Sequence, residues 1–92
     1  MVAVTQDVIE ALYETLIASG LAGVDALRLA GNEDGYALEV DEPSRHDRVI
    51  WFHNNPVLVI APAVEDRLGD AVIDLADSDD GDRLILVIRT EG

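Results

Sequence analysis

Residues 48–60, RVIWFHNNPVLVI, carry the pattern that decides the fold. Two largely apolar runs, at 48–52 and 57–60, favour strands because β-branched and aromatic side chains fit a pleated sheet. The letters between them, HNNP, are residues that favour a turn. The second run is apolar at every position, which is typical of a strand covered on both faces. The stretch therefore predicts a strand, a turn and a buried strand.

Two more strands are predicted on the N-terminal side of this stretch. Residues 25–30, DALRLA, alternate alanine and arginine with leucine, as a half-buried strand does. Residues 36–40, YALEV, alternate again, with one face formed by Tyr36, Leu38 and Val40. The cluster GNEDG between the two runs is typical of a turn. We therefore expect residues 25–40 to form a hairpin.

An amphipathic helix is predicted near the N-terminus. Apolar residues recur there every four positions in two rows: Val8, Leu12 and Leu16, and Ile9, Tyr13 and Ile17. Thr5 is placed to act as the N-cap, and Gly20 is placed to end the helix. Glu10 and Glu14 are expected on the side opposite the apolar rows.

Beyond residue 60 the sequence predicts a short helix and two final strands. Pro62 suits a first helical position and Gly69 a stop. The strands are expected at residues 71–76 and 83–89. One helix, six strands and a short helix make an α+β fold with a mainly antiparallel sheet, and the length allows a single domain, residues 1–92.

The acidic run DLADSDDGDRL, residues 74–84, raises the question of a calcium site. A calcium loop of the D-x-D-x-D-G type needs an oxygen ligand at its fifth position and an acid at its twelfth. Counted from Asp77, those positions are Gly81 and Ile88. Asp80-Gly81 is a preferred turn pair and the run lies between two strand patterns, so we predict a hairpin connection.

The charge of the chain narrows the choice of partner. Nineteen acidic residues face six cations, all of them arginine, which gives a formal net charge of −13. Such a surface repels phosphate backbones and anionic membranes, so neither nucleic acid nor a membrane is an expected partner. It keeps a protein in solution and favours basic partners, although adaptation to high salt produces the same composition.

The cysteine content and the apolar stretches of the sequence bear on the location of the protein in the cell. The chain has no cysteine, and MVAVTQDVIE lacks the basic and apolar regions of a secretory signal. The longest apolar stretch, PVLVIAPAV, is too short to cross a bilayer. The expected location is the cytoplasm.

Residues able to carry chemistry are few. Ser44, His46 and Asp47 are neighbours in the loop 41–47, but a catalytic triad is assembled from separate segments. His46 and His53 lie on either side of a predicted strand, which places them far from a shared metal ion. The carboxylates Glu39, Asp41 and Glu42 are interpreted as a solvated acidic face rather than as an acid–base pair. We therefore expect no enzymatic activity and no catalytic residue.

Nearly the whole chain resembles the HesB-like family of A-type iron–sulfur carrier and assembly proteins. The matching strings are TQDVIEALYETLIASG, DALRLAG, GYALEVDEP and the stretch from DRVIWF to LILVI. Asp47, Val49, Val57 and Val59 match the family's central strand motifs, and Ile73-Asp74 matches a later one. The resemblance implies a β-rich domain with a leading helix, in a family that often forms homo-oligomers.

The family's cluster ligands are missing from this chain. Family members hold iron or a cluster with three cysteines, one in a glycine-rich loop and two in a C-G-C segment after the last strand. The corresponding loop has no cysteine, and its five residues are Gly31, Asn32, Glu33, Asp34 and Gly35. The resemblance therefore implies a degenerate member with no cofactor, and carboxylates are poor substitutes for thiolates at such a cluster.

Two functions follow as expectations. The first is a non-catalytic domain that acts through protein contacts, as an accessory to an iron–sulfur or redox enzyme, with homo-oligomers allowed by the resemblance. The alternative is a metal-binding protein that uses carboxylates and histidines, among them Glu33 and Asp34, in place of the family cysteines.

Overall fold

The computed structural model describes residues 1–32, 35–75 and 86–89, and every structural statement below refers to those residues. They form an α+β fold, as the sequence predicts. In chain order the elements are β1 (Ala3–Val4), α1 (Gln6–Ala18), β2 (Ala26–Asn32), β3 (Gly35–Asp41), β4 (Arg48–Phe52), β5 (Asn55–Ile60), α2 (Pro62–Leu68), β6 (Val72–Leu75) and β7 (Leu86–Arg89).

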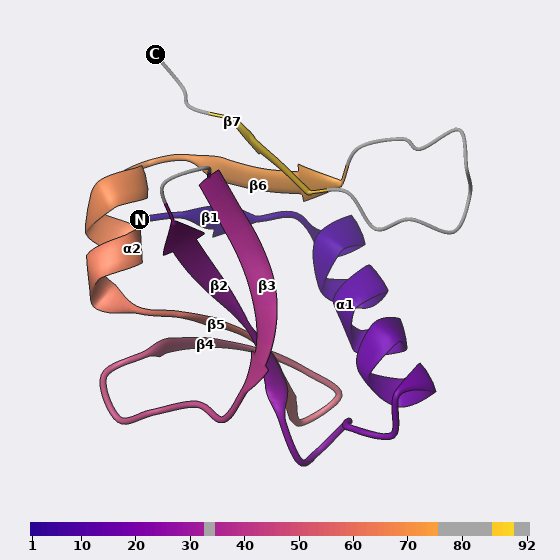
Figure 1. The fold of residues 1–92 in the computed structure, drawn as a ribbon. Coiled ribbons are helices and arrows are strands. Elements are labelled where there is room, and N and C mark those ends of the chain that lie inside the picture. Colours follow the sequence, from indigo (N-terminus) through magenta and orange to yellow (C-terminus); the bar gives the residue numbers. More distant parts are fainter. Residues whose placement is uncertain (33–34, 76–85, 90–92) are drawn as a thin grey trace.

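The described strands are arranged in two mixed sheets, with α1 and α2 on opposite sides of the molecule (Figure 1). One sheet has the order β1-β6-β7 and the other the order β3-β2-β5-β4. Pairs β2–β3, β4–β5 and β6–β7 are antiparallel, as expected from hairpin connections. Pairs β1–β6 and β2–β5 are parallel, which the expectation of a mainly antiparallel sheet did not include. Each parallel pair joins strands far apart in the chain, so no local pattern indicates it.

Helix α1 is held by one deeply buried row of side chains. Val8, Leu12 and Leu16 are 0–1% exposed, as predicted, whereas Ile17 in the second apolar row is 52% exposed. The helix ends at Ala18 with Ser19 as its C-cap, and Gly20 follows with a φ of 71°, a left-handed conformation that glycine adopts at little cost. The Leu21 N–H bonds to the Leu16 carbonyl at 2.8 Å, which together with Gly20 forms a Schellman cap.

The short strand β1 precedes α1 and was not predicted. Its residues Ala3 and Val4 pair with Val72 and Ile73 of β6. A two-residue strand has no alternation to detect, because its existence depends on a partner far along the chain. Thr5 occupies the N-cap position, but its hydroxyl makes no cap bond and instead donates to Asp74 Oδ1 of β6 at 3.2 Å.

Strands β4 and β5 form the hairpin that the sequence indicates most strongly. His53 and Asn54 have φ of 51° and 63°, the values of a two-residue type I′ turn. β5 begins at Asn55, and its residues 57–60 are each 0% exposed, so both faces are covered, as predicted. A register shift between Ile50 and Trp51 interrupts the pairing, and Trp51 is 60% exposed.

The other two expected hairpins are confirmed at their strands. β2 pairs with β3 from Ala26–Asp41 to Asn32–Gly35, and β6 pairs with β7. The predicted turn in the aspartate run lies in residues 76–85, outside the described residues.

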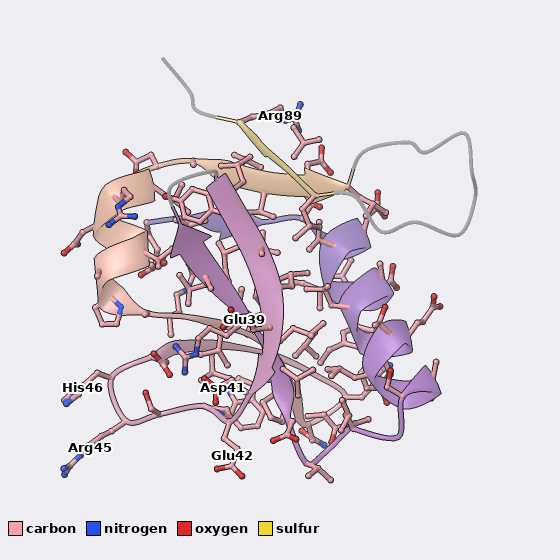
Figure 2. The ribbon with its side chains drawn as sticks, viewed as in Figure 1. Glu39, Asp41, Glu42, Arg45, His46 and Arg89 are labelled. Carbon is pink, nitrogen blue, oxygen red and sulfur yellow. The ribbon has the colours of Figure 1, made fainter. Side chains whose placement is uncertain are left out.

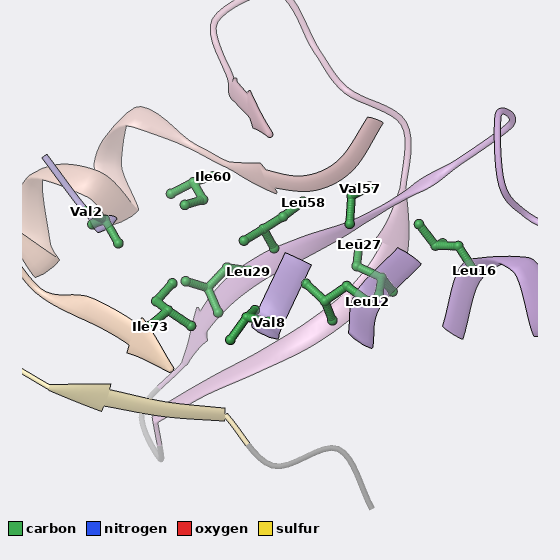
Figure 3. Packing of buried hydrophobic residues seen from close by; sticks show 10 residues of the cluster. All are labelled: Val2, Val8, Leu12, Leu16, Leu27, Leu29, Val57, Leu58, Ile60 and Ile73. Carbon is green, nitrogen blue, oxygen red and sulfur yellow. The ribbon is translucent and has the colours of Figure 1, made fainter. Parts of the chain in front are cut away.

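A single apolar core joins both sheets to α1 (Figure 3). Its ten buried members come from α1, β2, β5, β6 and the segment before β1: Val2, Val8, Leu12, Leu16, Leu27, Leu29, Val57, Leu58, Ile60 and Ile73. No polar or charged residue of the described part is fully buried. Burial of apolar surface is therefore the main source of stability, and polar chemistry lies at the periphery.

Candidate functional site

The loop of residues 31–35, which the resemblance implies is a vacant ligand loop, is only partly described. Gly31, Asn32 and Gly35 belong to the ends of β2 and β3, whereas Glu33 and Asp34 lie outside the described residues. A Cβ placed on Gly31 would lie 3.0 Å from Tyr36 Cε1 and 3.2 Å from Arg67 Nη1. The described base of this loop is thus closely packed against side chains.

Ser44, His46 and Asp47 do not form a catalytic arrangement. The Ser44 hydroxyl donates to Asp47 Oδ2 at 2.6 Å, and the Ser44 N–H donates to the same oxygen at 2.7 Å. His46 is exposed and points away from the molecule beside Arg45 (Figure 2). The serine and the aspartate therefore stabilise the turn from Ser44 to Asp47, and the side chain of His46, within that turn, forms no hydrogen bond with either of them.

The two histidines lie beyond opposite ends of β4, as the sequence predicts. His46 precedes the strand, and His53 lies in the turn that follows it. Within the described segments, no three residues of the types His, Asp or Glu come together as a candidate metal site. The described residues thus give no support to the metal-binding alternative, and Glu33 and Asp34 lie outside them.

An ion-pair network centred on Arg28 organises the loop after β3. The Arg28 Nη1 and Nη2 atoms donate to the two carboxylate oxygens of Asp47 at 3.0 and 2.6 Å. Its Nε donates to Asp41 Oδ2 at 2.7 Å, and Nη2 also donates to the Glu42 carbonyl. The Asp47 side chain is only 3% exposed and that of Arg28 is 17% exposed. Such a paired, hydrogen-bonded geometry is what makes a nearly buried charge tolerable.

The network shifts the pKa of each of its members toward the value that favours the charged form. Hydrogen bonds from Arg28, and then from Ser44, hold the pKa of Asp47 well below its usual range. Arg28 and the Glu42 N–H likewise lower the pKa of Asp41, and Asp47 raises the pKa of Arg28. All three groups stay charged near neutral pH, so the network is a structural clamp rather than an acid–base device.

Of the three carboxylates in the predicted acidic face, only that of Asp41 takes part in this network. Glu39, on β3, and Glu42, directly after β3, are both exposed (Figure 2). The interpretation of a solvated face holds for Glu39 and for the side chain of Glu42. Asp41 instead has a structural partner in Arg28.

A surface groove lies between α1 and the β4–β5 turn. Its volume is about 430 Å³, and it is lined by Glu10, Tyr13, Glu14, Ile17, Phe52 and His53. The three rings are in mutual contact: the centroid distances are 5.0 Å for Tyr13–Phe52, 5.3 Å for Tyr13–His53 and 4.2 Å for Phe52–His53. The groove thus combines an aromatic cluster with carboxylates on its rim.

The two carboxylates of this groove, those of Glu10 and Glu14, form no ion pair within the described part of the chain. Both residues are exposed. Three arginines are engaged elsewhere: Arg28 with Asp41 and Asp47, Arg48 with Glu65, and Arg89 with Asp74. Among the described residues that line the groove there are two carboxylates and no arginine.

A second hollow, of about 250 Å³, lies between β3 and β7. It is lined by Leu29, Tyr36, Ala37, Leu38, Leu86 and Ile88, so it has no charged side chain in its walls. The residues that flank β7 on both sides lie outside the described residues. The groove on α1 is therefore the candidate site, because all of its elements are described and its side chains have a definite charge.

No protein-family model matches the chain, and no curated protein sequence gives a significant match. Both helices of the described part, of 13 and 7 residues, are too short to cross a bilayer.

Sequence reasoning missed the groove because it depends on two distant segments. Tyr13 and Ile17 are predicted on an apolar helix face, His53 in a solvated turn, and Glu10 and Glu14 on the opposite side of the helix. The last prediction is wrong, because Glu10 and Glu14 line the same groove as Tyr13 and Ile17. The available signal was the second apolar row of α1, since a helix with two rows has more apolar surface than one core contact can cover.

Proposed function

We propose that this protein is a non-catalytic interaction module that binds a basic segment of a partner protein in the groove between α1 and the β4–β5 turn. The observation that carries the proposal is the aromatic cluster of Tyr13, Phe52 and His53 beside the carboxylates Glu10 and Glu14. Aromatic side chains supply contact area at low entropic cost, and rim carboxylates steer and orient a cationic partner.

The overall charge of the chain also supports a basic partner. A net charge of −13 on 92 residues accelerates association with a basic protein and repels nucleic acid. Ile17, one of the residues that line the groove, is 52% exposed and adds apolar contact surface to it.

We further propose that the module is a degenerate HesB-like domain and that its partner is an iron–sulfur or redox enzyme in the cytoplasm. One observation supports this part: from α1 onward, the described elements occur in the order that the resemblance implies, a leading helix followed by strands and one short helix. The family link rests on this resemblance and on shared strings alone.

The test is affinity capture of the tagged protein at native expression, followed by mass spectrometry of stoichiometric partners. We expect one dominant partner with a basic surface segment. In the variant Glu10→Gln/Glu14→Gln that partner should be lost, because the two substitutions remove the rim charge and keep the side-chain shape.

A matched control separates the groove from general acidity. The variant Glu39→Gln/Glu42→Gln also raises the net charge from −13 to −11, but both of its side chains are exposed at β3 and the following loop. It should retain the partner. Equal loss in both variants would show that bulk charge, rather than the groove, carries the interaction.

A further inference from the structure

We propose that the groove selects arginine over lysine, by stacking one guanidinium of the partner against the ring cluster while Glu10 and Glu14 pair with its N–H groups. This inference rests on the proposed function and specifies the chemistry of the partner. The reasoning uses the ring geometry, the spacing of the carboxylates and the difference between the two cations.

The three rings form a compact unit in which each ring contacts the other two. Phe52 and His53 meet edge to face, with an interplanar angle of 77°, and Tyr13 meets Phe52 at 68°. In an edge-to-face pair, the ring that contributes its edge keeps both of its faces out of that contact. His53 is exposed, and Tyr13 and Phe52 are half-buried, so the cluster reaches the surface of the groove.

The carboxylates are spaced to serve the same ligand. Glu10, Tyr13, Glu14 and Ile17 occupy positions i, i+3, i+4 and i+7 of α1, so they lie along one face of the helix. A cation placed over the Tyr13 ring therefore has a carboxylate from the same turn and one from the preceding turn within its surroundings. Both carboxylates lack an ion-pair partner among the described residues.

Arginine fits this arrangement better than lysine does. The guanidinium is planar and weakly hydrated, stacks on aromatic faces and presents five N–H donors in a fixed fork. The lysine ammonium is compact and strongly hydrated, and it has no flat face to place against a ring. Carboxylates pair with the donor fork of arginine, and the ring cluster adds a stacking contact that lysine lacks, so removal of a ring should reduce the preference for arginine.

The experiment is a titration by fluorescence anisotropy with three labelled peptides that differ at one central residue. That residue is arginine, lysine or citrulline, which keeps the shape of arginine without its charge, and two flanking lysines are common to all three. We expect the arginine peptide to bind about tenfold more tightly than the lysine peptide and the citrulline peptide to bind weakest.

Two variants assign the preference to the groove. His53→Asn removes a ring and keeps the turn, since asparagine tolerates the φ of 51° at this position. It should reduce the arginine preference while leaving lysine-peptide binding nearly unchanged. Glu14→Gln should weaken both peptides, because it removes charge and leaves the rings in place.

The outcomes separate this inference from the proposed function. Equal binding of the arginine and lysine peptides would overturn the arginine preference and leave a general basic-segment site intact. Failure of both peptides to bind would overturn both proposals. Self-association of the protein is measured by sedimentation velocity. If it were lost both in Glu10→Gln/Glu14→Gln and in Arg45→Met, which removes an exposed arginine, the groove would be assigned to a second copy of this chain and the proposal would be overturned.

Discussion

Replacing Arg28 with methionine should destabilise the fold more than any other single change of a charged residue that we consider. The substitution keeps an unbranched side chain in β2 and removes both donors to Asp47. Asp47, with its side chain 3% exposed, would then keep a nearly buried charge whose remaining donors are the N–H and hydroxyl of Ser44. Breaking a buried pair by removal of one partner typically costs about 3–5 kcal/mol.

The expected loss can be compared with the total free energy of unfolding of a small domain. Total stabilities of small domains are about 5–15 kcal/mol, so this loss would be a large share of the whole. Urea slopes for small proteins are about 1–3 kcal/mol per molar, so a loss of about 3 kcal/mol lowers the midpoint by at least about 1 M. The Asp41 contact adds less, because that carboxylate is 50% exposed and remains hydrated when Arg28 is lost.

The assay is urea unfolding at neutral pH, followed by far-UV circular dichroism. Arg45→Met is the matched control. Arg45 lies in the loop that contains Asp47, is exposed and forms no ion pair with a described residue. Its midpoint should stay close to that of the wild type. Arg28→Met/Asp47→Asn should recover part of the loss, because it no longer leaves a charge unpaired. Equal midpoints for Arg28→Met and Arg45→Met would refute the assignment of a stabilising role to the network.

Three further predictions concern the same fold. The pKa of Asp47 is lower in the folded than in the unfolded protein, so its stabilisation is complete above the unfolded pKa of about 3.9 and is lost as the pH falls through the folded value. Below about pH 4 the urea midpoint of the wild type should therefore fall more steeply than that of Asp47→Asn, and parallel curves would contradict the pairing. Leu12→Ala should cost about 2–5 kcal/mol in urea unfolding because Leu12 is 0% exposed, and a loss below 1 kcal/mol would show that the core collapses around it. Gly20→Ala should cost about 1–2 kcal/mol, from the left-handed φ of 71° alone, since no atom lies within 4 Å of the added methyl; an unchanged melting temperature would mean that the cap reorganises.

The parts of the fold that could be predicted from the sequence are those that depend on neighbours in the chain. The strand at 48–52, the buried strand at 57–60 and the helix that starts at Pro62 each have a local pattern, and the structure places them as expected. The parallel pairs β1–β6 and β2–β5 have no such pattern, because their partners are brought together only by the assembled core.

The candidate site shows the same limit more sharply. Arg28 appears in the sequence as an alternating strand residue, and nothing local shows that it will meet Asp47 across the loop 41–47. The groove likewise forms only when α1 packs against β4 and brings Tyr13 to Phe52. In contrast, the exclusion of a triad at Ser44 was possible in advance, since neighbouring residues in a loop rarely converge as a triad requires.

Salt separates the two roles that acidity could have in this protein. Repulsion among 19 acidic residues destabilises the folded state, and added salt screens it, so the melting temperature should rise with ionic strength. Attraction between the groove and a basic peptide is screened by the same ions, so its affinity should fall over the same range. Glu10→Gln/Glu14→Gln changes two of the 19 acids, and should flatten the salt dependence of binding much more than that of stability. If this variant and Glu39→Gln/Glu42→Gln flattened the binding curve equally, the attraction would come from the net charge of the chain, and the position of the carboxylates beside Tyr13 would have no special role.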